Sequence, residues 1–228
     1  MQPVPHAARS ARSLALAIAL CAVAALAAAA VDPARGAART AAEPTPVYVT
    51  TTSDGPPTPC KPARSCSLRD AIETVAQTGE PGRIIARFCG EGVPGPYCLG
   101  QDDPNYFPAA GVWRIPLSEG FGFDITGTLV TIDFSAGVPG WHGAADNVIE
   151  VDTGKDGLDW AFGMDGRDHV LRGFNLRGDV TTAQVVLYNG ATNVTLDGLA
   201  FAGVGAVGAN GGDAIRIRDE RTAGNRVR

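Results

Sequence analysis

Short segments that share one pattern recur along the second half of the chain, and this recurrence constrains the fold more than any other feature. Each segment combines an apolar, a charged and a glycine position: VTIDFSAG (130–137), HVLRGFNLRG (169–178), NVTLDGLAFAG (193–203) and NRVR (225–228). The apolar anchors are Ile132, Leu171, Leu196 and Val227, and the glycine position holds Phe134, Gly173 and Gly198. The anchors are unevenly spaced, but within the roughly 20 to 50 residues that are typical of solenoids and propellers.

A second set of apolar runs lies between these anchors. The runs are NVIEV (147–151), QVVLY (184–188) and DAIRI (213–217), so each repeat holds at least two short strands. Short strands joined by turns, with each repeat stacked on the last, predict a β-solenoid with one continuous core. A propeller is the alternative, but its blades of about 40 residues are longer and more regular than these repeats.

The segment CSLRDAIETVAQTG (66–79) is the one convincing helix, and we predict it over residues 67–78. Ser67 serves as the N-cap with Asp70 three residues later, and Gly79 supplies the C-terminal stop. Its apolar residues share one face by their spacing: Leu68, Ala71, Ile72, Val75 and Ala76. Because the first turn of a solenoid exposes apolar side chains and unpaired strand edges, we expect this helix to cover that end.

The N-terminus has the layout of a secretory signal peptide. Arg9 and Arg12 precede the apolar run 14–30, which ends in three alanines. We expect cleavage after Ala30. An uncleaved membrane anchor is the alternative, although the run is at the short end of the roughly 17 to 25 residues that span a bilayer.

The cysteines beyond this segment predict disulfides. They are Cys60, Cys66, Cys89 and Cys98, an even number in a chain that we expect to be exported. Three pairings are open, and we prefer the nearest neighbours, Cys60 with Cys66 and Cys89 with Cys98. No C-x-x-C pair supports a zinc site, so no bound metal is expected here.

The charge of the chain excludes nucleic acid as an expected partner. The net charge is −5, and Lys61 and Lys155 are the only lysines. No basic run occurs beyond the N-terminus, so the positive patch that nucleic-acid binding requires is absent from the sequence. Contact with a membrane is expected only through the export signal.

Three segments together resemble a known family. CSLRDAI (66–72) closely resembles the CSLREA motif that marks the N-terminal region of many exported bacterial proteins, VTIDFSAGVPGW (130–141) is similar to their VTIDG-x-x-QPGY segment, and GNRVR (224–228) is similar to a truncated GN-x-V-x-G-N-x-I rung. The chain departs from the family at Asp70, where Glu is usual, and at Phe134, where Gly is usual. The resemblance implies export and an all-β, right-handed parallel β-helix of the pectate-lyase type with an N-terminal capping helix, but no catalytic residues.

The predicted organisation has four parts. They are a signal peptide (1–30), a linker (31–46), an N-terminal cap region with the helix and a disulfide-stapled loop (47–111), and incomplete β-helix rungs (112–228). The final residues fall in the middle of a repeat. Because a solenoid needs both ends covered, we expect the C-terminal end to be truncated, or a partner chain to cover it.

Six residues are candidates for ligand binding: Asp197, Asp213, Arg216, Arg218, Trp141 and Trp160. The four charged residues fall at outward positions of the late repeats, where rows of side chains suit an acidic polysaccharide or Ca²⁺, although a solvated face has the same pattern. We expect the two tryptophans to lie in Gly-rich turns, where an exposed ring stacks on a sugar or packs over a loop. No resident cofactor is expected, and Ca²⁺ is the open alternative.

Catalytic residues are not evident. A pectinolytic enzyme needs carboxylates that bind Ca²⁺ and a base, or paired carboxylates for hydrolysis. His169 takes the inward position that Val194 takes in the next repeat, so we expect a buried histidine rather than a base. We therefore expect an exported surface or secreted scaffold that binds glycans. A polysaccharide lyase or glycoside hydrolase acting on acidic polysaccharide is the alternative.

Overall fold

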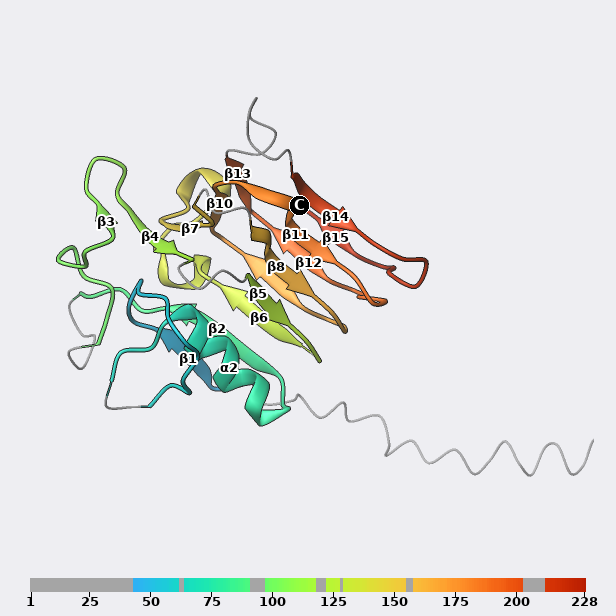
Figure 1. Ribbon diagram of the computed structural model, residues 1–228. Helices are drawn as coiled ribbons and strands as arrows, with labels where there is room; N and C mark the ends of the chain where they lie inside the picture. Colours follow the sequence, from blue (N-terminus) through green and yellow to red (C-terminus); the bar gives the residue numbers. More distant parts are fainter. Residues whose placement is uncertain are drawn as a thin grey trace, which may run out of the picture. The chain divides into compact units, whose positions relative to one another are not determined.

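The computed structural model describes residues 43–61, 64–90, 97–117, 122–127, 129–154, 158–202 and 212–228 (Figure 1). The chain divides into two units, residues 1–43 and 44–228. The predicted signal peptide (1–30) and most of the predicted linker (31–46) lie outside the described residues. In the second unit, the described residues form β-strands, two short 3₁₀ helices and a single α-helix, so the prediction of a β-rich chain is confirmed.

The strands form three sheets, named here by number. Sheet 1 contains, in spatial order, β1 (Pro46–Val49), β2 (Gly82–Ala86), β6 (Val130–Asp133), β9 (Val170–Arg172), β12 (Thr195–Asp197) and β15 (Arg226–Val227). Sheet 2 contains β13 (Ala200–Ala202), β10 (Asn175–Arg177), β7 (Ile149–Asp152), β4 (Val112–Pro116) and β3 (Tyr106–Phe107). Sheet 3 contains β14 (Asp213–Ile217), β11 (Val180–Leu187), β8 (Leu158–Met164) and β5 (Phe123–Ile125).

The predicted fold class, a single right-handed parallel β-helix, is wrong for this structure. The described strands belong to three separate sheets and do not close into one solenoid. Sheet 2 is mixed, because β3 folds back and pairs antiparallel with β4 through Tyr106 and Trp113. The repeats in the sequence indicate which strands occupy corresponding positions in a sheet, but they do not indicate how the edges of the three sheets meet.

The alignment of the repeats is nevertheless confirmed at the level of strand pairing. Ile132 pairs with Leu171, Leu171 with Leu196, and Leu196 with Val227, all in parallel register within sheet 1. The first three side chains are buried, whereas Val227, on the edge strand β15, is 61% exposed. From β4 onward the chain visits sheets 2, 3 and 1 in a fixed order, so each strand from β7 to β15 pairs with the strand three places before it (Figure 1).

The glycine position of the repeats is a turn between sheets 1 and 2. Gly173 and Gly198 adopt φ of 76° and 59°, a region that residues with a Cβ rarely occupy, and each joins two strands tightly. Phe134 stands at the same position with φ of −83° and starts a longer connection instead. That connection contains the 3₁₀ helices η3 (Ser135–Gly137) and η4 (Ala144–Asp146). The departure from glycine at Phe134 therefore coincides with the insertion that carries Trp141.

The predicted helix is confirmed as α2 (Leu68–Thr78). Ser67 and Asp70 form the reciprocal capping box, and Gly79 ends the helix with φ of 64°. The buried face consists of Leu68, Ala71, Ile72 and Val75, while Ala76, which we predicted on the same face, is exposed. The helix packs against β1 and β5, the first strands of sheets 1 and 3, and against β2. It therefore covers that end of the sheets, as the apolar face predicted.

Arg69 ties the helix both to the loop that precedes it and to sheet 3. The Arg69 Nε and Nη2 donate to the two carboxylate oxygens of Asp54 at 2.7 and 2.9 Å. The same guanidinium lies 4.8 Å from the ring centroid of Phe123, the first residue of β5. Because the Asp54 side chain is only 1% exposed, the pair fixes the helix more firmly than an exposed ion pair would.

The core is continuous across the three sheets and contains stacked aromatic rings. Phe134, Phe162 and Phe174 are fully buried, with ring centroids 5.4 Å apart for Phe134 and Phe174 and 5.5 Å apart for Phe162 and Phe174. These spacings lie in the range that favours aromatic pairs.

Both predicted disulfides are confirmed. Cys60 bonds to Cys66 and Cys89 bonds to Cys98, with Cα–Cα distances of 5.2 and 5.0 Å. The first closes the loop that leads into α2, and the second closes the loop after β2. Such bonds are compatible with an exported protein, because they persist in oxidising compartments.

Candidate functional site

The outer face of sheet 3 gathers aromatic and charged side chains from β5, β8 and β14, and from Tyr188, which directly follows β11. In the inner row, Phe123, Phe162 and Val185 pair side by side and are buried in the core. Successive residues of a strand point to opposite faces. The next row therefore points to the opposite face, and it contains Asp124, Gly163, Val186 and Arg216, one from each strand. Gly163 and Val186 in the middle of this row are buried, whereas Asp124 is exposed and Arg216 is partly exposed.

Trp160 lies on the same face as Asp124, although simple alternation would place it with Phe162, two residues later in β8. Ala161 and Phe162 are both buried in the core, so the alternation breaks between them. Trp160 is partly exposed, and its indole reaches Asp124. Trp160 pairs with Ala183, which is buried and pairs in turn with Asp213 on β14. The register between β8 and β11 is irregular just before this pair, between Val180 and Ala183.

Two aromatic side chains share one carboxylate on this face. The Trp160 indole Nε1–H donates to the Asp124 Oδ1 at 3.1 Å, and the Tyr188 hydroxyl donates to the same oxygen at 3.5 Å. The two ring centroids are 6.1 Å apart, with the planes inclined by 35°. Asp124 is exposed and both rings are partly exposed. We call Trp160, Tyr188 and Asp124 the aromatic platform.

Gly163 makes the platform geometry available. A Cβ at this position would lie 2.6 Å from the Asp124 Oδ1 and 2.7 Å from the Trp160 Nε1, closer than nonbonded atoms approach one another. The missing side chain therefore lets the indole lie close to the backbone of the sheet while its N–H reaches the carboxylate.

The hydroxyl of Tyr188 stays protonated at neutral pH. Partial burial raises the pKa of Tyr188 above its ordinary value, and the negative charges of Asp124 and Asp165 and the hydrogen bond to Asp124 raise the pKa further. The protonated hydroxyl is both a donor and an acceptor of hydrogen bonds.

Three of the sequence candidates meet on this sheet. Trp160, Asp213 and Arg216 lie on its outer face, and Arg216 binds Asp213 through Nε at 2.8 Å and Nη2 at 2.7 Å. Arg218 follows β14 directly and is exposed, and its backbone N–H donates to the Leu187 carbonyl at 2.8 Å. We expected Trp160 in a turn, but it lies in β8, a strand that the sequence patterns missed.

Trp141 and Asp197 lie apart from this group, next to sheet 1. Trp141 donates its Nε1–H to the Asn147 Oδ1 at 2.9 Å, and the Arg172 guanidinium lies 4.9 Å from its ring centroid. Arg172 Nε is 3.3 Å from the Asp197 Oδ2, an ion pair whose geometry does not make a hydrogen bond. Gly198 packs against the edge of the same indole. Side chains of the protein thus surround Trp141, and a ligand-binding role for Trp141 and Asp197 stays a prediction.

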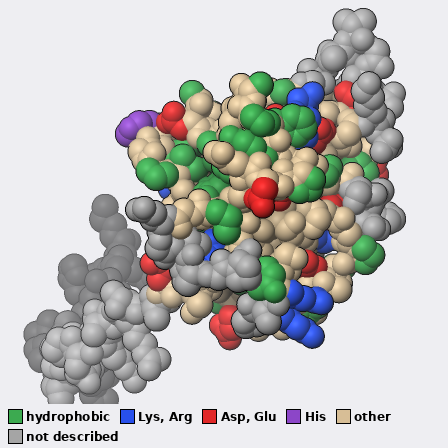
Figure 2. All heavy atoms as spheres, turned by 90° about the vertical axis from the view of Figure 1, so that its left-hand side faces the viewer, with side chains coloured by type: hydrophobic (Ala, Val, Ile, Leu, Met, Phe, Trp, Pro, Cys, Tyr) green, Lys and Arg blue, Asp and Glu red, His purple; other side chains and the backbone are tan. Residues whose placement is uncertain are grey.

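A third charged group lies on sheet 2. Arg114 Nε donates to the Glu150 Oε1 at 2.6 Å and lies 3.5 Å from the Asp152 Oδ2, while Arg177 approaches the same two carboxylates at 3.6 and 3.8 Å. Phe107 packs under the Arg114 guanidinium, 3.9 Å from ring centroid to carbon. The two arginines offset the two carboxylates, so this group carries no net charge. On the face of the molecule in Figure 2, acidic and basic side chains are likewise interspersed among uncharged ones.

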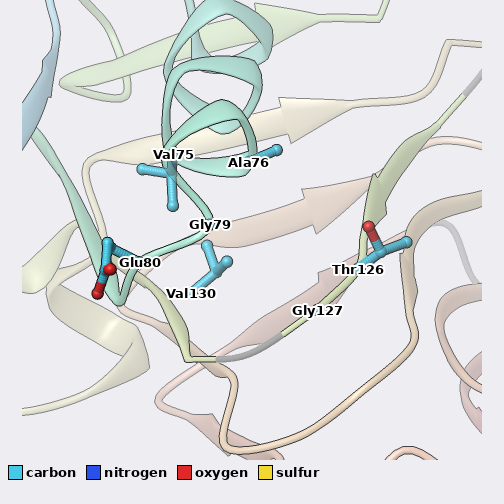
Figure 3. A pocket seen from close by; sticks show the side chains of 7 residues that line it. All are labelled: Val75, Ala76, Gly79, Glu80, Thr126, Gly127 and Val130. Carbon is cyan, nitrogen blue, oxygen red and sulfur yellow. The ribbon is translucent and has the colours of Figure 1, made fainter.

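A small pocket of about 170 Å³ lies beside the end of α2 (Figure 3). Its lining residues are Val75, Ala76, Gly79, Glu80, Thr126, Gly127 and Val130. Figure 3 shows the last turn of the helix on one side and the segment with Thr126 and Gly127 on the other. Glu80 is the single ionisable residue of the lining, so the pocket lacks the convergent polar groups of a typical ligand site.

His169 is buried and its ring nitrogens are both used, as we expected. The Val130 N–H donates to Nδ1 at 3.2 Å, and Nε2 lies 2.9 Å from the Asp165 carbonyl oxygen, to which it donates. Burial lowers the pKa of His169 below its ordinary value, although the bond to Asp165 and the charges of Asp168 and Asp165 oppose this. The neutral imidazole joins the connection after β8 to the start of β6.

Within the residues that the structure describes, no group of three or more His, Cys, Asp or Glu side chains is arranged to hold a metal ion. No helix in the described ranges is long and apolar enough to cross a membrane. No protein-family model, curated protein or solved structure significantly matches this chain.

Sequence reasoning missed Asp124, Gly163 and Tyr188 as members of a site. A signal for Asp124 was present, since Phe123-Asp124-Ile125 alternates apolar, acidic and apolar residues. Tyr188 ends the run QVVLY, which we predicted as a strand without assigning the tyrosine to a face. Only the broken alternation at Ala161 and Phe162 and the strand register bring both residues to Trp160.

Proposed function

We propose that this protein is an exported scaffold that binds glycans on the outer face of sheet 3, without catalysing their cleavage. The observation that carries the proposal is the aromatic platform, in which Trp160 and Tyr188 share the carboxylate of Asp124.

The chemistry of the platform suits a sugar. The face of an aromatic ring carries partial negative charge, so it favours contact with the C–H groups on one face of a pyranose. The remaining Asp124 oxygen and the Tyr188 hydroxyl offer hydrogen bonds to sugar hydroxyls at the edge of the rings. Apolar rings with a few placed polar groups are the usual composition of a small-molecule site.

Export is supported by two features. The disulfides Cys60–Cys66 and Cys89–Cys98 are compatible with an oxidising compartment. The apolar segment 14–30 has the composition of a signal peptide. The resemblance of residues 66–72 to the CSLREA motif agrees with export as well.

Binding is tested by retention on a panel of polysaccharides and by titration calorimetry with the glycans that retain the protein. We expect Trp160→Ala and Tyr188→Ala each to weaken binding about tenfold, which corresponds to the loss of one stacked ring. Tyr48→Ala is the matched control, because Tyr48 is 40% exposed on β1 in sheet 1, away from the platform.

Equal retention of the wild type and both platform variants would contradict the proposal. The same incubations are analysed for soluble products of the polysaccharides. Cleavage that the wild type supports would instead favour the alternative, a polysaccharide lyase or glycoside hydrolase.

A further inference from the structure

The charges that act on the aromatic platform are negative. The Asp124 carboxylate accepts hydrogen bonds from the Trp160 indole N–H and the Tyr188 hydroxyl. The negative charge of Asp165 also raises the pKa of Tyr188. Asp159, the second residue of β8, is exposed, and its carboxylate accepts a hydrogen bond from the Thr181 hydroxyl at 2.6 Å.

Arg216, the arginine of the same row, is bound by both Nε and Nη2 to Asp213, so these two charges offset each other. Asp213 is itself 52% exposed. Arg218 lies beyond the end of β14, next to Tyr188 in the strand register, and is exposed to solvent. The charged groups that raise the pKa of Tyr188 are Asp124 and Asp165, and both are negative.

We infer that the platform takes neutral glycans and rejects glycans that carry carboxylates, an inference that rests on the proposed glycan-binding function. In a pyranose stacked on Trp160 and Tyr188, the hydroxyl groups lie near Asp124 Oδ2, the carboxylate oxygen that accepts no hydrogen bond from either aromatic side chain. A sugar hydroxyl donates a hydrogen bond to this oxygen. A sugar carboxylate in the same place is repelled by the like charge of Asp124, and water and salt screen this repulsion only in part. Asp124 thereby determines specificity as well as affinity.

The test compares one neutral oligosaccharide that the protein binds with the same oligosaccharide oxidised at C6, in which each hydroxymethyl group becomes a carboxylate while the sugar rings and linkages stay the same. Titration calorimetry at low salt measures both dissociation constants for the wild type, Asp124→Asn and Asp102→Asn. Asparagine keeps an acceptor at position 124 but removes the charge. Asp102→Asn is the matched control, because it removes the same charge from an exposed residue in the loop before β3.

We expect the wild type to bind the neutral form at least about fivefold more tightly than the oxidised form. Asp124→Asn should reduce this ratio toward one by binding the oxidised form more tightly, and Asp102→Asn should leave the ratio unchanged. Added salt should reduce the wild-type ratio in the same direction.

Equal or tighter binding of the oxidised form by the wild type would overturn the inference and leave the proposed function standing. So would a preference that Asp124→Asn does not change. Failure of every glycan to bind, or binding that Trp160→Ala does not weaken, would overturn the proposed function and this inference with it.

Discussion

Acid should destabilise this protein through His169, which is fully buried. In the folded protein the neutral ring accepts from the Val130 N–H and donates to the Asp165 carbonyl. Protonation would place a second N–H against the Val130 N–H and bury a charge. The pKa of His169 is therefore lowered on folding.

The sign of the effect follows from this shift. Above about pH 6.5, the ordinary histidine pKa, neither the folded nor the unfolded state binds the proton, and the stability is at its full value. Below that pH the unfolded chain binds the proton and the folded protein does not. The free energy of unfolding then falls by up to about 1.4 kcal/mol per pH unit until the pH reaches the folded pKa. Because pH 5 lies about 1.5 units below the ordinary histidine pKa, the loss at pH 5 is at most about 2 kcal/mol.

The measurement is urea unfolding of the wild type and His169→Gln at pH 7.5 and pH 5. Glutamine retains a donor and an acceptor but does not titrate, so we expect the variant to be about 1 to 2 kcal/mol less stable at pH 7.5. The difference between wild type and variant should then shrink at pH 5. His142→Gln is the matched control, because His142 is exposed, and this variant should follow the wild type at both pH values.

An unchanged difference between the wild type and His169→Gln at the two pH values would refute the reasoning. It would mean that the folded state binds the proton as readily as the unfolded chain does.

Three further substitutions test the core, the helix and the platform. Phe174→Ala should lower the free energy of unfolding by about 3 to 5 kcal/mol in urea titrations, and a loss below about 1 kcal/mol would contradict the observed packing. Ile72→Asp places a charge on the buried face of α2 and should give an insoluble or protease-sensitive product; a soluble, resistant product would refute the capping role. Gly163→Ala should separate Trp160 from Asp124 and weaken glycan binding about tenfold while changing stability by less than about 1 kcal/mol; unaltered affinity would show that the close approach is unimportant.

The local features of this fold were predictable from adjacent residues. The capping box of Ser67 and Asp70 and the stop at Gly79 depend only on side chains within one turn of the backbone that they bind. The two disulfides join cysteines separated by 6 and 9 residues, so their pairing follows from chain proximity. The buried His169 followed from its alignment with Val194 in the next repeat.

The platform was only partly predictable. Trp160 was a candidate because an aromatic residue stood among glycines, but the sequence pattern around it did not indicate a strand. Ala161 and Phe162 are both buried in the core, so the face to which Trp160 points departs from simple alternation, and a shift of one residue moves a side chain to the opposite face. Asp124 and Tyr188 join Trp160 from positions 36 and 28 residues away in the chain.

By itself, the amino-acid sequence determined the helix, its caps, the disulfide pairs and the equivalence of the anchors Ile132, Leu171 and Leu196, because each of these follows from short-range contacts or from periodicity. The tertiary structure decided that the strands form three sheets, one of them mixed, and that Trp160 and Tyr188 share the Asp124 carboxylate. These features depend on register and on the meeting of distant strands, where the free energy comes from packing between segments rather than from any one segment.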